Sequence, residues 1–205
     1  MKRLLAYLSI IATLFFLAAV VAFLFLAPDL DPMRSAISFY ALTRFGIIID
    51  LAFALVGVSG ISLAIALWPT TLSVAGRIGL VLLIAWGISS ILAGAFPIDA
   101  PGAVPTLSGS IHNMAGLNFF LVAPAVLLIE LTRSILVAPT GQRPTTYWLA
   151  WLLLASAVLV FTFNGPLSSL GIGGLAQRLY WLVLALWLIL KAGQVVRAKG
   201  TRSEA

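Results

Sequence analysis

The apolar residues of this chain gather into six long runs, and each run is long enough to cross a membrane as a helix. About 20 residues of helix span a bilayer core, and backbone polar groups cannot stay unpaired in hydrocarbon, which excludes other structures for such runs. We predict spans at residues 4–27, 45–68, 77–96, 111–131, 147–163 and 175–196. Pro124 is expected to kink the fourth span. The pattern predicts an all-α fold, a six-helix transmembrane bundle that forms a single integral membrane domain over residues 1–205.

The first apolar run could be mistaken for a secretory signal, because Lys2 and Arg3 precede it. A signal has an apolar core of only about 7–15 residues. The run from Leu4 to Ala27 is longer, and no A-x-A site precedes Pro28. We therefore expect a retained helix and no cleavage.

Composition agrees with this pattern. Hydrophobic residues make up 62% of the 205 residues and charged residues 9%, against about 45–50% and about 25% in soluble domains. The net charge of +6 does not indicate nucleic acid, because the basic residues lie singly at the ends of apolar runs. Without cysteine, the chain has no disulfide, thiolate metal site or cysteine nucleophile.

The basic residues also predict an orientation, since cytoplasmic loops are rich in Lys and Arg. With the N-terminus inside, nine of the 12 lie on the cytoplasmic side: Lys2, Arg3, Arg77, Arg133, Arg143, Lys191, Arg197, Lys199 and Arg202. The other three, Arg34, Arg44 and Arg178, lie outside with the loops 28–44, 97–110 and 164–174. We predict a plasma-membrane protein with both termini in the cytoplasm.

Small residues recur at near-helical spacing in the second and third runs, which predicts seams where helices approach closely. The seam residues are Gly46, Asp50, Gly57 and Ala64, and then Gly79, Gly87, Ser90 and Gly94. Asp50 is the unusual member, because a carboxylate within a span is costly and is by default a candidate site. The alternative is a structural ion pair with Arg178 that fixes the helix arrangement.

The outward polar stretch 96–113 holds Asp99 and His112, the only histidine. Together with Ser38 in the first outward loop, they supply a nucleophile, a base and an orienting acid, the parts of a hydrolytic triad. His112 is expected at the start of the fourth helix, with Ser108 or Ser110 placed to cap it. In the alternative to the triad, His112 only hydrogen-bonds neighbouring loop groups. The candidate ligand-binding residues are Asp50, Arg44, Asn113 and Arg178. A single histidine makes a zinc site improbable, and we expect no metal or other cofactor.

Four short strings resemble the membrane family known as domain of unknown function 998, whose members have a similar size and six predicted helices. They are Ile37-Ser38, Phe96-Pro97-Ile98-Asp99, Gly109-Ser110-Ile111-His112 and Gly174-Leu175-Ala176-Gln177-Arg178. The resemblance implies that Ser38, Asp99, His112 and Arg178 are shared polar positions on the outward side. It departs at Ser35-Ala36, where the family usually has His-Pro, and it brings no established activity.

Three functions stay open from the sequence. The first is a membrane protein with an outward polar pocket for a lipid headgroup or small solute, formed by Ser38, Asp50, Asp99, His112 and Arg178. The second is a membrane hydrolase of a lipid ester or amide. The third is a transporter subunit, for which only Pro124 offers an interrupted helix. The expected partners are membrane lipids and a second copy of the chain, not nucleic acid.

Overall fold

A computed structural model describes residues 1–137 and 145–198, and these residues form helices joined by loops without any strand. The α-helices are α1 (Lys2–Leu26), α2 (Gly46–Leu67), α3 (Val74–Ala95), α4 (Leu107–Gly116), α5 (Phe119–Val137), α6 (Thr145–Asn164) and α7 (Gly173–Arg197). Short 3₁₀ helices lie in the connections: η1 (Ile37–Leu42), η2 (Trp68–Thr70) and η3 (Ser168–Leu170).

Six stretches of the described chain are long and apolar enough to cross a membrane, which confirms the predicted fold class. Five of them are single helices within a few residues of the predicted spans, apart from the short η2 that continues α2. The fourth stretch, Leu107–Arg133, contains both α4 and α5. The bundle is therefore six spans built from seven α-helices in the described residues.

The prediction of a single helix over the fourth span, at residues 111–131, is wrong. The chain breaks at Leu117 and Asn118, and Pro124 lies within α5. The break is held to α3 by two side-chain bonds, from Ser89 Oγ to the Ala115 carbonyl (3.0 Å) and from Asn118 Nδ2 to Ser90 Oγ (3.2 Å).

The start of α4 also differs from the prediction. Thr106 caps the helix by accepting from the Gly109 N–H (3.0 Å). Neither serine has this role, since Ser108 donates to the Pro97 carbonyl and Ser110 to the Thr106 carbonyl. The helix consequently begins four residues before the predicted start at 111.

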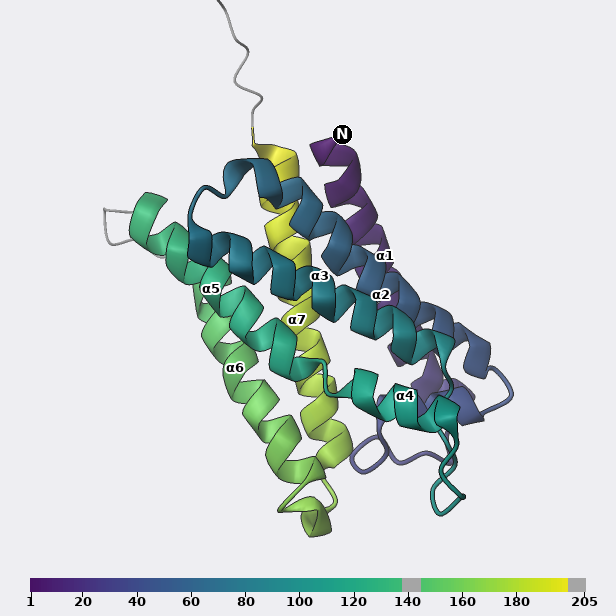
Figure 1. The fold of residues 1–205 in the computed structure, drawn as a ribbon. Coiled ribbons are helices and arrows are strands. Elements are labelled where there is room, and N and C mark those ends of the chain that lie inside the picture. The colour runs from purple at the N-terminus through teal and green to yellow at the C-terminus, as the bar shows by residue number, and fades with distance from the viewer. Residues whose placement is uncertain (138–144, 199–205) are drawn as a thin grey trace, which may run out of the picture.

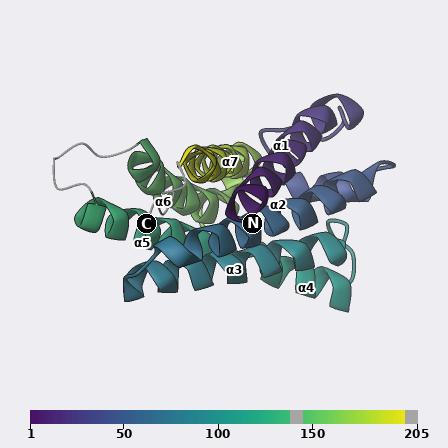
Figure 2. The same ribbon diagram turned by 90° about the horizontal axis from the view of Figure 1, so that it is seen from above.

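The described helices pack side by side, as Figures 1 and 2 show. In the view from above, α2 lies between α1 and α3, and α7 lies between α1 and α6. The predicted close approach of α2 and α3 is present: a Cβ on Gly87 would lie 2.6 Å from the Gly57 carbonyl oxygen, and one on Gly94 would overlap the Asp50 carbonyl. Glycine is needed at this crossing because the two backbones touch.

The loops that precede α2, α4 and α7 all lie at one end of the bundle, shown at the bottom of Figure 1. The N-terminus and the last turn of α7 lie at the opposite end, where Arg3 donates to the Ala198 carbonyl (3.1 Å). We call these the loop end and the terminal end. Their separation agrees with the predicted topology, while the cytoplasmic location of the termini stays a prediction.

Candidate functional site

A cavity of about 260 Å³ lies at the loop end, between η1, the α4–α5 break and the adjoining ends of α6 and α7. Its polar lining residues are Ser38, His112, Asn113, Asn118, Asn164, Gln177 and Tyr180. Aromatic rings of Phe39, Phe53 and Trp181 form part of the wall. Among the described residues that line it, none is Asp, Glu, Lys or Arg, so the cavity offers hydrogen bonds without a fixed charge.

His112 is held in one orientation by the end of α3. Its Nδ1 lies 2.9 Å from both the Ala93 and the Phe96 carbonyl oxygens. Because carbonyls only accept, Nδ1 must carry a proton, so the tautomer of the neutral ring that fits these contacts has its lone pair on Nε2. The side chain is only 5% exposed, and its ring meets the edge of Phe53. Nε2 makes no hydrogen bond within the described residues.

Asp99 does not orient His112, so the predicted triad geometry is not formed. Its carboxylate accepts from the Thr106 N–H (2.8 Å) and the Thr106 hydroxyl (2.7 Å). These hydrogen bonds hold the pKa of the Asp99 carboxyl below its ordinary value of 3.8, since they stabilise the charged form. Asp99 closes the loop before α4 and does not line the cavity.

Ser38 lies in η1, is 8% exposed, and lines the same cavity as His112. Two residues of α7 hold the loop that carries it. Gln177 Oε1 accepts from the Ile37 N–H (2.6 Å). Arg178 donates to the Pro32 and Ser35 carbonyls and to the Tyr40 hydroxyl, at 2.7 to 2.8 Å.

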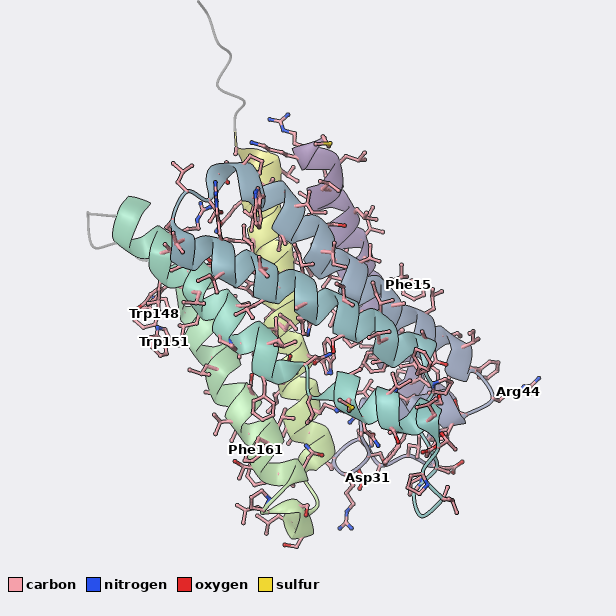
Figure 3. The ribbon with its side chains drawn as sticks, viewed as in Figure 1. Phe15, Asp31, Arg44, Trp148, Trp151 and Phe161 are labelled. Atoms are coloured by element: carbon pink, nitrogen blue, oxygen red, sulfur yellow. The ribbon has the colours of Figure 1, made fainter. Side chains whose placement is uncertain are left out.

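Arg178 therefore holds the loop between α1 and α2 in place, and it does not form the predicted ion pair with Asp50. The Asp50 Oδ1 atom is buried without a hydrogen-bond partner in the described chain, within electrostatic range of His112. Asp50 does not line the cavity. Arg44 does not line the cavity either. Figure 3 shows its side chain pointing out from the loop end, and its guanidinium lies over the Phe45 ring.

Of the seven residues predicted as catalytic or ligand-binding, Ser38, His112 and Asn113 line the cavity. The cavity is also lined by three amide side chains that were not among the predicted site residues, Asn118, Asn164 and Gln177. Asn118 lies within an apolar span, and a polar residue in that position is a usable signal. No group of three or more His, Cys, Asp or Glu that could hold a metal occurs in the described part of the chain.

A second polar cluster was also missed, near the terminal end. Glu130 of α5 pairs with Lys191 of α7 and accepts from Trp187 Nε1 and Thr146 Oγ1, each at 3.0 Å. Lys191 is only 1% exposed. Lys191 was counted among the basic residues of the cytoplasmic side, but its ammonium lies inside the bundle and joins α7 to α5.

Comparison with known proteins found one family model, described as protein of unknown function (DUF998), which matches residues 10–193. No curated protein and no solved structure matches. The matched region contains every cavity residue and all four strings on which the resemblance rests. A match over most of the chain is sufficient to assign the family, and the protein belongs to the DUF998 family.

Proposed function

We propose that this protein binds a small polar ligand, the headgroup of a membrane lipid or a small solute, in the cavity at the loop end. The observation that carries the proposal is a hydrogen-bonding cavity without a fixed charge, in a bundle that exposes many large apolar side chains. Ligand sites are typically concave, with apolar and aromatic walls and a few convergent polar groups.

The polar groups of the cavity are only partly used by the protein. The side-chain oxygen of Gln177 accepts from the Ile37 N–H, which leaves the amide hydrogens of Gln177 for another partner. Asn118 donates to Ser90, which leaves its carbonyl oxygen. His112 keeps the Nε2 lone pair. Polar groups without partners are costly away from water, so a bound ligand or ordered water would stabilise this arrangement.

Native mass spectrometry of the purified protein, incubated with a polar lipid extract of the host membrane, tests the proposal. We expect wild-type protein to retain a bound molecule, and His112→Ala and Asn113→Leu to lower that retention at least fivefold. Asn113 is exposed and makes no hydrogen bond in the described residues, so its substitution should preserve the fold. Arg44→Ala is the matched control, since Arg44 points away from the cavity. Equal retention by all four proteins would refute the proposal.

A second candidate, hydrolysis of a lipid ester or amide, is favoured by two observations. Ser38 and His112 line the same cavity, and backbone carbonyls fix the tautomer that leaves Nε2 as a base. Ser38 Oγ would attack the carbonyl carbon while Nε2 accepts the hydroxyl proton. His112 would then protonate the departing alcohol or amine, and water would hydrolyse the acyl-serine. The backbone carbonyls take the orienting role first assigned to Asp99.

Labelling with a fluorophosphonate probe separates the hydrolase from a binding protein. Labelling of the wild type that is lost in Ser38→Ala and kept in Ser168→Ala, an exposed serine of η3, would establish an activated Ser38. Labelling that survives Ser38→Ala would exclude it. A transporter subunit has less support, because α4–α5 is the one interrupted span among those described, and transporters pair such spans.

A further inference from the structure

The charge of the cavity restricts what can occupy it. Arg178, which follows the lining residue Gln177 in the sequence, is committed to the Pro32, Ser35 and Gly174 carbonyls and to Tyr40. Asp99 is committed to Thr106. Phosphate and carboxylate groups are bound in proteins mainly by Arg, Lys or oriented N–H groups. The cavity supplies no Arg or Lys side chain from the described residues, so an anionic headgroup would be buried without a counter-charge.

The available atoms instead complement hydroxyl or amide groups. The Gln177 amide donates, the Asn118 oxygen and His112 Nε2 accept, and the Ser38 hydroxyl does either. A ligand hydroxyl, which both donates and accepts, can satisfy this mixed set. The volume of about 260 Å³ lies just below the range of about 300–1,000 Å³ that is usual for whole drug-sized ligands. The cavity therefore fits a headgroup and not a complete lipid.

One wall of the cavity reaches the exposed surface of the bundle. Gly116 and Leu117 at the α4–α5 break both line the cavity and are exposed, and a Cβ added to Gly116 would meet nothing within 4 Å. Exposed Phe120 follows, and its ring lies 5.9 Å from that of Phe161 on α6. Figure 3 shows Phe161 on the outer part of α6 at the loop end. In a bilayer these apolar side chains face acyl chains.

We infer that the ligand is an uncharged amphiphile, whose small hydroxyl- or amide-bearing headgroup occupies the cavity and whose acyl chain leaves at the α4–α5 break, across Leu117, Phe120 and Phe161. This inference rests on the proposed binding function and names its ligand class. A monoacylglycerol has the required chemistry.

The test measures binding of three probes to the intact protein in detergent, by native mass spectrometry and by thermal shift. Monooleoylglycerol supplies the chain and an uncharged headgroup, monooleoylglycerol phosphate adds a negative charge, and glycerol lacks the chain. We expect monooleoylglycerol to bind at least tenfold more tightly than either of the others. Gly116→Leu should weaken it at least tenfold by filling the exit. Gly193→Leu is the matched control, because this glycine of α7 also has open space around it.

The possible failures are distinguishable. Equal or tighter binding of the phosphate, still lost in His112→Ala, would overturn the uncharged class and leave the binding cavity intact. If glycerol bound as tightly as monooleoylglycerol, only the claim that an acyl chain leaves at the α4–α5 break would be wrong. Monooleoylglycerol binding that neither Gly116→Leu nor His112→Ala changes would overturn both proposals. If no probe binds while the host lipid extract still binds in a His112-dependent way, the ligand class alone is wrong.

Discussion

Asp99, which was predicted as a catalytic residue, has a structural role in the loop before α4. Its carboxylate closes the loop through Thr106, and Gly109 packs directly against it, since a Cβ at Gly109 would overlap the carboxylate. The strings Phe96–Asp99 and Gly109–His112 therefore form one folded unit, joined a second time by the bond from His112 to the Phe96 carbonyl. Asp99 and Gly109 set the position of His112 without touching the cavity.

Asp99→Asn should change how stability depends on pH. Hydrogen bonds from Thr106 lower the pKa of Asp99 in the folded protein, so the stability they contribute is present above its ordinary value of 3.8 and is lost as pH falls through the lower folded value. Between about pH 5 and about pH 2, the melting temperature of the wild type should fall more steeply than that of Asp99→Asn.

Thermal unfolding in detergent at a series of pH values checks this expectation. Asp29→Asn is the control, because Asp29 is an exposed acid of the loop end that accepts no hydrogen bond in the described structure. Parallel melting curves for wild type and Asp99→Asn over this interval would show that Thr106 does not stabilise the charged carboxylate.

At the scale of helices, features that depend on local hydrophobicity can be predicted from the sequence. Features that depend on contacts between residues far apart in the chain cannot. The spans follow from the length of the apolar runs. The α4–α5 break does not, because it depends on bonds from Ser89 and Asn118 that join residues 26 and 28 positions apart. Lys191 was misplaced for the same reason, since its partner Glu130 lies 61 positions away. The site was predicted in part: Ser38, His112 and Asn113 stood out chemically, whereas Gln177 reaches the cavity only through tertiary packing.

The ion pair between α5 and α7 should be important for stability. Glu130→Gln leaves the buried Lys191 ammonium without a compensating charge, and removal of one member of a buried pair costs about 3–5 kcal/mol. The double variant Glu130→Gln/Lys191→Met removes both charges and should recover most of this loss. Reversible unfolding of Glu130→Gln, Lys191→Met and the double variant measures the coupling energy of the pair. Strictly additive losses in the free energy of unfolding would show that the two side chains do not interact.

At the scale of the whole molecule, the bundle has a loop end with the cavity and a terminal end with the Glu130 cluster. Exposed Trp148 and Trp151 on the outer face of α6 (Figure 3) lie toward the terminal end of that helix, where amphipathic rings favour a membrane interface. Excluding buried Lys191 from the count of cytoplasmic basic residues leaves eight against three, so the bias persists. We therefore predict that the cavity opens on the side opposite the cytoplasm.

Single cysteines test this orientation directly, because the chain has none of its own. Ser169→Cys lies at the loop end and Leu72→Cys at the terminal end, and both positions are exposed. A membrane-impermeant maleimide should label Ser169→Cys in intact cells, and Leu72→Cys only after permeabilisation. The reverse pattern would place the cavity on the cytoplasmic side.

The central claim is that the cavity at the loop end holds a ligand, and the most direct measurement is an experimental density map of the protein in lipid nanodiscs supplied with monooleoylglycerol. We expect density in the cavity within hydrogen-bond reach of His112 Nε2 and the Gln177 amide, continuing as a chain past Leu117 toward Phe161. A cavity that contains only water, or that is closed by the side chains of η1 and α4, would contradict it.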